Sequence, residues 1–209
     1  MEAQLVKLYD KNNSFATISN VVNVLNKNGV IIYPTDTMYA LGCSINSVQA
    51  INRICEIKNI QSNKNRFSFI CNDLSAISNY AKVSDFAFKT LKRYLPGPYT
   101  FILPASYKVP SILVQGKKTV GVRIPEYLPI LEIVKELGVP LLTTSLPTLN
   151  LALEEYTDPS LIFDRYKNQV DLILDGGYGA IDPSSVIQID ENDQFEIIRE
   201  GAGDIADFS

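Results

Sequence analysis

Three oxygen-bearing side chains follow an apolar run near the N-terminus. Thr35, Asp36 and Thr37 come after residues 30–33, from which Pro34 separates them. An open α/β sheet presents a polar site in this way, where a buried strand ends and the chain passes into a turn. We therefore expect a binding site at this turn.

Basic residues from three other places are expected to complete the site. Lys58, Lys64 and Arg66 belong to one polar segment, and Arg123 and Arg199 lie further along the chain. Cations hold phosphate strongly because their hydrogen bonds to it are charge-assisted. The pattern indicates a pocket for a small anionic molecule. The alternative for the polar segment is a solvated basic surface loop.

Arg123 lies inside the apolar segment 118–124, which alternates as a strand does. Successive side chains of a strand point to opposite faces, so the aliphatic residues share one face and Arg123 points to the other. An unpaired charge is costly to bury. Arg123 therefore needs either an internal carboxylate or a ligand anion, and both alternatives stay open.

Hydroxyl groups flank two further predicted strands. Thr143 and Ser145 end the strand 141–145, and Ser184 precedes the strand 185–189. Such groups either cap turns or line a cavity. In the second case we expect Thr143 and Ser145 to face the same cavity as Thr35, whereas Ser184 belongs to an ordinary turn pattern.

The chain contains no histidine. This excludes histidine acid–base catalysis, Ser-His-Asp and Cys-His nucleophile systems, and histidine metal sites. The three cysteines form no CxxC pair, so we expect neither a disulfide framework nor a zinc site. Walker and dinucleotide fingerprints are also missing. Any chemistry must rely on positioning, cations, hydroxyls, carboxylates or a substrate-borne metal.

The 209 residues are 46% hydrophobic and 20% charged, which is typical of a single soluble domain over residues 1–209. No apolar run approaches the roughly 20 residues of a membrane span, and the N-terminus lacks a signal-peptide pattern. We expect a cytoplasmic protein that does not bind membranes and has no C-terminal extension domain.

Apolar strands and amphipathic helices alternate along the chain, which predicts one α/β domain with a mixed, twisted sheet. Strands are predicted at residues 5–8, 30–33, 67–71, 99–103, 118–124, 141–145, 170–174, 185–189 and 195–199. Helices are predicted from a cap at Asn13 or Ser14 to Gly29, from Ser47 onward, and over 84–95 and 128–137. Phe15 and Val48 are assigned to apolar helix faces. Residues 147–159 are the least patterned and are expected to form a linker or lid.

Charge is divided unevenly. Residues 1–149 carry 16 basic and 9 acidic side chains, whereas residues 150–209 carry 3 basic and 14 acidic ones. Such asymmetry fits either an anionic partner for the basic part or an acidic segment that only keeps the protein soluble.

Eight motifs occur together in a fixed order: YPTDTMYALG, EIK, LPGPYTFIL, GVRIP, TTS, GG, PSSVI and IIREG, between residues 33 and 201. On these motifs the chain resembles the YrdC/YciO family over most of its length. The resemblance implies a twisted mixed sheet with flanking helices and a large concave basic cavity. It also implies L-threonylcarbamoyladenylate synthesis from threonine, bicarbonate and ATP carrying Mg²⁺, with release of pyrophosphate, for tRNA threonylcarbamoyladenosine modification. Family members have also been described as binding double-stranded RNA.

The resemblance further implies roles for individual residues. Substrate contacts are expected from Thr35, Thr143 and Ser184. Catalytic roles are expected for Lys58, Arg123 and Ser145, and nucleotide contacts for Lys58, Ser145 and Arg199. Apart from the resemblance, the basic segment makes Lys64 and Arg66 candidate phosphate contacts. No protein-bound metal is expected.

Two positions depart from the synthase pattern. Ile60 replaces the arginine of its Lys-x-Arg motif, and Pro147 replaces the asparagine of its Ser-x-Asn motif. The sequence Thr144-Ser145-Leu146 resembles the YciO branch instead. Two alternatives to the synthase therefore stand: a YciO-type paralogue acting on a related carbamoyl, adenylyl or modified-RNA substrate, and a non-catalytic double-stranded-RNA-binding protein.

Overall fold

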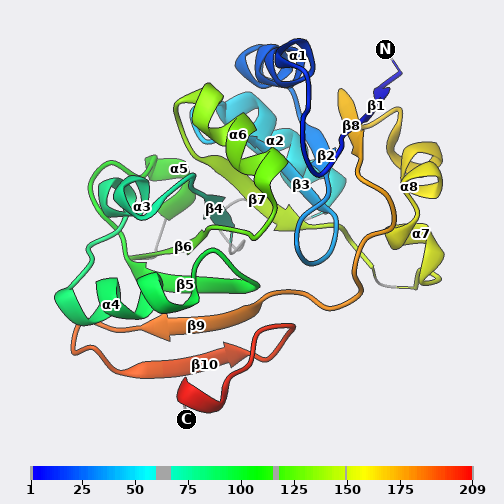
Figure 1. The fold of residues 1–209 in the computed structure, drawn as a ribbon. Helices are drawn as coiled ribbons and strands as arrows, with labels where there is room; N and C mark the ends of the chain where they lie inside the picture. The colour runs from blue at the N-terminus through cyan, green and yellow to red at the C-terminus, as the bar shows by residue number, and fades with distance from the viewer. Residues whose placement is uncertain (1, 60–66, 115–117, 149, 209) are drawn as a thin grey trace.

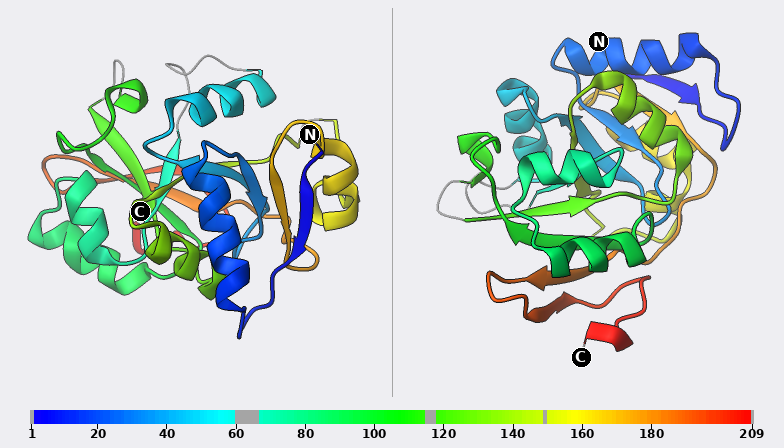
Figure 2. Two further views of the ribbon diagram at one scale, coloured as in Figure 1. Left: turned by 90° about the horizontal axis from the view of Figure 1, so that it is seen from above. Right: turned by 60° about the vertical axis from the view of Figure 1, so that its left-hand side comes forward.

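The computed structural model describes residues 2–59, 67–114, 118–148 and 150–208. Within them the chain forms one ten-stranded mixed sheet in the order β1-β8-β2-β3-β7-β4-β6-β5-β9-β10. Figure 1 shows this sheet running from β1, beside the N-terminus, to β10, near the C-terminus, and the right-hand view of Figure 2 shows the same separation of the termini. The predicted single α/β domain with a mixed sheet is confirmed.

The strands are β1 (Gln4–Lys7), β2 (Ile31–Tyr33), β3 (Ala40–Ser44), β4 (Ser68–Ile70), β5 (Tyr99–Pro104), β6 (Thr119–Arg123), β7 (Leu141–Ser145), β8 (Leu172–Asp175), β9 (Ser185–Ile189) and β10 (Phe195–Arg199). The helices are α1 (Phe15–Asn26), α2 (Val48–Ile57), α3 (Leu74–Tyr80), α4 (Asp85–Tyr94), α5 (Ser111–Val114), α6 (Leu128–Leu137), α7 (Glu154–Thr157) and α8 (Pro159–Tyr166).

Serine caps begin three of these helices. Ser14, Ser47 and Ser84 accept hydrogen bonds from the backbone of the first turns of α1, α2 and α4, which satisfies donors that a helix start leaves free. Helix α6 instead ends at Gly138, whose φ of 75° is the left-handed conformation that glycine adopts at little cost.

The two faces of the sheet are buried by different helices. Helices α1 and α6 pack against one face, where their side chains join Ile31, Tyr33 and Leu172. Helices α2, α3, α4 and α8 contribute to the core on the other face, which includes Phe101 and Val122. The cluster under α1 and α6 reaches from β8 and β2 to Leu141 of β7 and Ile70 of β4, and the part of this face beyond it is available for a cavity.

Several sequence predictions are corrected. Phe15 and Val48 lie on exposed sides of their helices, 74% and 52% exposed, because the buried stripes are narrower than predicted. The segment 147–159 is not wholly irregular. It contains α7, and it ends at Pro159, the first residue of α8 after the Asp158 cap. Strand β3 and helix α3 had not been predicted. Within the described residues, the helices are too short or too polar to traverse a bilayer.

Candidate functional site

A cavity of about 530 Å³ lies over the part of the sheet that α1 and α6 leave uncovered. This volume is in the usual range for small-molecule sites. Strand register explains its floor, because directly paired residues of neighbouring strands share a face. One row runs across the sheet through Thr143, Ser68, Gly121, Ile102 and Gln188.

Small residues in this row keep the floor open. A Cβ atom on Gly121 would lie 2.6 Å from Oγ of Ser68, so the glycine is needed for the two strands to present this surface together. The alternate residues of the same strands, such as Phe69, Val122 and Phe101, point into the core on the opposite face. The predicted alternation of residues 118–124 is therefore confirmed.

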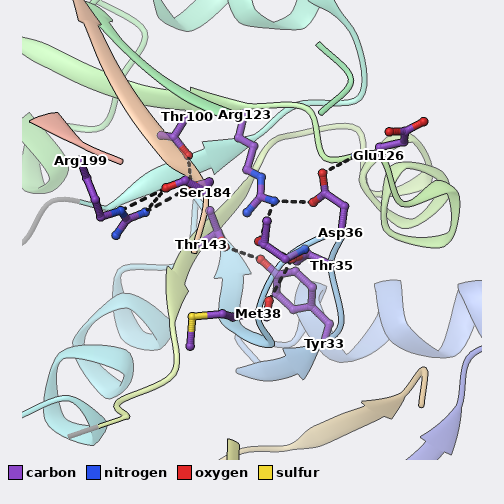
Figure 3. Close-up of polar contacts among 11 residues, drawn as sticks. Tyr33, Thr35, Asp36, Met38, Thr100, Arg123, Glu126, Thr143, Ser184 and Arg199 are labelled. Atoms are coloured by element: carbon purple, nitrogen blue, oxygen red, sulfur yellow. Dashed lines mark hydrogen bonds and ion pairs between the residues drawn. The ribbon is translucent and has the colours of Figure 1, made fainter. Parts of the chain in front are cut away.

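The polar turn after β2 is held by Thr35. Its hydroxyl donates to the carbonyl of Met38 at 2.9 Å and accepts from the backbone N–H of Thr37 at 3.0 Å. Thr37 and Met38 line the cavity, whereas Thr35 is not among the described lining residues. Figure 3 shows Thr35 in the turn beside Asp36. In this structure Thr35 thus positions the turn, and the hydroxyl facing the cavity is that of Thr37.

Arg123 projects from the end of β6 and forms an ion pair with Asp36 (Figure 3). The same guanidinium nitrogen donates to Oγ1 of Thr37 at 2.8 Å. The second carboxylate oxygen of Asp36 accepts from the backbone N–H of Glu126 at 2.9 Å. Of the two alternatives for Arg123, the structure shows the internal carboxylate, which fixes the guanidinium at the cavity wall.

Arg123 keeps hydrogen-bonding capacity beyond this pair. Its Nε is buried and has no partner among the described residues. Burial lowers the pKa of Arg123, and the carboxylate of Asp36 opposes that shift. A buried donor without a partner is costly, so a ligand acceptor at this position would be stabilised.

Arg199, at the end of β10, approaches the cavity from another wall. It donates to the carbonyl of Ser184 at 2.8 and 3.1 Å, and Oγ of Ser184 lies 2.9 Å from Oγ1 of Thr100 (Figure 3). Partial desolvation and the positive charge of Arg123 both lower the pKa of Arg199. Both arginines line the same cavity.

Lys58 follows α2 and reaches the far end of β7. Its ammonium donates to the carbonyl of Ser145 at 2.6 Å, and burial lowers its pKa. Ser145 lines the cavity, so Lys58 lies at its margin and not within its wall. Lys64, Arg66 and Ile60 lie outside the described residues.

Thr143 is held by Tyr33, whose hydroxyl donates to Oγ1 of Thr143 at 2.6 Å. Burial raises the pKa of Tyr33, so the phenol stays protonated and remains a donor. Thr143 and Ser184 both line the cavity, as does Ser145. Half-buried Pro147 is not among the described lining residues.

The structure also brings in residues that the sequence reasoning missed. Met38, Ser68, Thr100 and Gln188 line the cavity. Thr100 and Gln188 carried a signal, because each is a polar residue at an alternate position of a predicted apolar strand. Ser68 carried the same signal in the predicted strand 67–71, but its place beside Gly121 follows from strand pairing far along the chain.

Taken together, the fold and site define a class: an α/β protein with a cavity on the open face of a mixed sheet, lined by hydroxyls and two arginines. The model of the Sua5/YciO/YrdC family, described as "Telomere recombination", matches residues 23–201. The chain belongs to this family.

Relatives of known sequence or structure agree with this assignment. YciO of Escherichia coli is 41% identical over 209 residues, which cover 99% of each chain, and its crystal structure superimposes with a TM-score of 0.89 over 99% of this chain and 100% of that one. A putative threonylcarbamoyl-AMP synthase of Methanocaldococcus jannaschii is 31% identical, over 96% of this chain and 94% of that protein. Sua5 of P. abyssi, solved with L-threonine, shares the fold with a TM-score of 0.81 at 24% identity, over 95% of this chain and 58% of that one.

Proposed function

We propose that this cavity binds ATP and an amino acid. We further propose that the protein catalyses L-threonylcarbamoyladenylate synthesis for tRNA modification, or a reaction closely related to it. The observation that carries the proposal is the pair Arg123 and Arg199 at one cavity. Among the described residues a single carboxylate, Asp36, pairs with one of them. The repulsion between the two arginines would be relieved by a polyphosphate placed between them.

The chemistry suits a chain without histidine. In the proposed reaction the amine of threonine and bicarbonate give a carbamate and water. A carbamate oxygen then attacks the α-phosphorus of ATP in line, the bond to the β-phosphate breaks, and pyrophosphate leaves. Orientation of the reactants and neutralisation of phosphate charge are the main requirements of such a step. Mg²⁺ would arrive with ATP, as part of the substrate.

Named residues would divide these tasks. Arg123 and Arg199 would hold phosphate oxygens, and Lys58 would add charge at the end of β7. Thr37, Thr143 and Ser145 would supply neutral hydroxyl donors and acceptors beside them. The P. abyssi protein was solved with L-threonine, and the M. jannaschii relative is named as a putative synthase, which supports an amino-acid substrate in this family.

The test is an assay of the purified protein with ATP, Mg²⁺, L-threonine and bicarbonate. We expect pyrophosphate release that requires both threonine and bicarbonate. Arg199→Ala should weaken ATP binding about tenfold or more, because a hydrogen bond to a charged group is lost. Arg93→Ala is the matched control, since Arg93 is an exposed arginine paired with Asp207. ATP affinity that is equal in both variants would overturn the assignment.

A second candidate is favoured by the two departures from the synthase pattern, Ile60 and Pro147. In this case the cavity would process a related carbamoyl or adenylyl compound, or the modified RNA itself. ATP binding without threonine-dependent pyrophosphate release would favour this candidate. RNA affinity with a steep salt dependence, unchanged in Lys58→Ala and Arg123→Ala, would instead favour a non-catalytic RNA-binding protein.

A further inference from the structure

Gln188 lies at the end of the cavity floor farthest from the polar turn. It is the last member of the row that begins at Thr143, and it pairs directly with Ile102 across β5 and β9. The side chain is half-buried and lines the cavity. Nothing in the proposed phosphate chemistry uses this amide.

The distance between Gln188 and the part of the cavity wall that carries Arg199 is similar to the distance between the base and the phosphates of a nucleotide. Ser184, whose carbonyl accepts from Arg199, directly precedes β9 and lines the cavity, as Gln188 does. The separation of four residues between these positions corresponds to about 13 Å at the rise of a strand. Val186 lies between them and also lines the cavity. An extended nucleoside phosphate has a comparable length.

The surroundings of the amide suit a flat ring. Ile102, which pairs with Gln188, and Val186, two residues before it, contribute apolar side chains beside the amide. Leu113 and Ile198 also line the cavity. Ligand sites typically combine such apolar walls with a few polar groups that fix orientation. The amide of Gln188 is such a group.

The amide is also available for a ligand. Its Nε2 donates to Glu196 on the neighbouring strand β10 over a long 3.4 Å. The amide oxygen and the second N–H hydrogen remain for another partner. A glutamine amide therefore offers one acceptor beside one donor at the cavity.

We propose that Gln188 is the specificity residue that recognises the adenine ring of the bound nucleotide. The inference rests on the proposed function, because it assigns the base end of the same nucleotide. A glutamine amide matches adenine, which presents an amino donor next to a ring-nitrogen acceptor. On its Hoogsteen edge adenine offers the N6 amino donor beside the N7 acceptor, whereas guanine offers two acceptors, O6 and N7. The amide therefore pairs with this edge through both of its groups in adenine and not in guanine.

The experiment measures binding of ATP, GTP and inorganic tripolyphosphate by calorimetry in four proteins: the unmodified chain, Gln188→Leu, Gln188→Glu and Gln4→Leu. In Gln188→Leu we expect ATP affinity to fall about tenfold or more, with unchanged tripolyphosphate affinity and loss of the preference for ATP over GTP. Gln188→Glu should shift preference toward GTP, because a carboxylate accepts from the two adjacent donors of guanine. Gln4→Leu makes the same change at an exposed position of β1, the edge strand at the other end of the sheet. Its affinities for all three compounds should equal those of the unmodified chain.

The outcomes separate this inference from the proposed function. If the unmodified chain binds neither ATP nor tripolyphosphate, the proposed function and the inference both fail. If it binds ATP but Gln188→Leu keeps the same ratio of ATP to GTP affinity, only the role of Gln188 is overturned. Thermal unfolding of each variant shows that the compared proteins are folded.

Discussion

The guanidinium of Arg123 and the carboxylate of Asp36 form an ion pair in which only 8% and 10% of the two side chains are exposed. The partners come from different strand ends, β6 and the turn after β2, and lie 87 residues apart in sequence. One contact therefore ties two walls of the cavity together. It also sets the direction from which Arg123 faces the cavity.

The first prediction concerns this pair. Asp36→Asn should lower the free energy of unfolding by about 3 kcal/mol, because removing one partner leaves the other charge buried and uncompensated. Urea unfolding followed by circular dichroism measures the change. Asp164→Asn is the control, since its pair with Lys167 is exposed and should contribute no more than about 1 kcal/mol. Equal losses in the two variants would contradict the prediction.

The second prediction concerns pH. Burial lowers the pKa of Lys58 from its usual 10.5, so the ammonium loses its charge at a lower pH than an exposed lysine does. If Lys58 contacts phosphate, ATP affinity should decline as pH rises from neutral toward about 10. In Lys58→Arg the decline should be absent, because arginine stays protonated over this range. Calorimetric titration with ATP across this pH range measures the affinity of both proteins. If the two affinities change with pH in the same way, Lys58 does not contact phosphate.

The third prediction concerns Gly201, which follows Arg199 closely. A Cβ atom at this position would lie 2.2 Å from the carbonyl oxygen of Pro183 and 2.7 Å from the carbonyl of Ser184. Gly201→Ala should therefore displace the wall that holds Arg199, with a loss of about 2 kcal/mol in stability and weaker ATP binding. The exposed neighbour Glu200 provides the control Glu200→Ala, expected to stay within about 0.5 kcal/mol. If Gly201→Ala is less stable but binds ATP with unchanged affinity, the wall that holds Arg199 is not part of the ATP site.

The fourth prediction concerns the two departures from the synthase pattern. Ile60→Arg combined with Pro147→Asn should raise threonine-dependent pyrophosphate release above that of the unmodified protein, because both changes restore polar groups of the synthase motifs. Each single variant serves as a control for the pair. A double variant with no gain would indicate that the cavity is adapted to another reaction.

Much of the fold could be predicted from local patterns. The apolar run before Pro34 and the alternation around Arg123 identified β2 and β6, because each pattern reflects burial of the strand itself. Strand β3 was missed because four of its five residues are small and give no clear alternation around Leu41, although all five are buried.

The site was less accessible to prediction. The partner of Arg123 could not be chosen, since the ion pair depends on where the turn after β2 lies relative to β6 in the assembled sheet. Thr35 was expected to face substrate, but the hydroxyl that closes its turn cannot be distinguished by sequence from one that faces a ligand. The cap and proline at Asp158 and Pro159 were a readable helix start within the segment expected to be a linker or lid.

Strand β7 pairs with β3 on one side and β4 on the other, and both pairings are antiparallel. A shift of β7 by a single residue would turn Leu142 toward the ligand space and bury the hydroxyl of Thr143 among aliphatic side chains. Deletion of one residue from β7 would therefore remove binding and stability at once. Evolution of this protein toward other substrates can therefore proceed by replacing side chains that line the cavity. Insertions or deletions in β7 would disrupt the cavity and the core together.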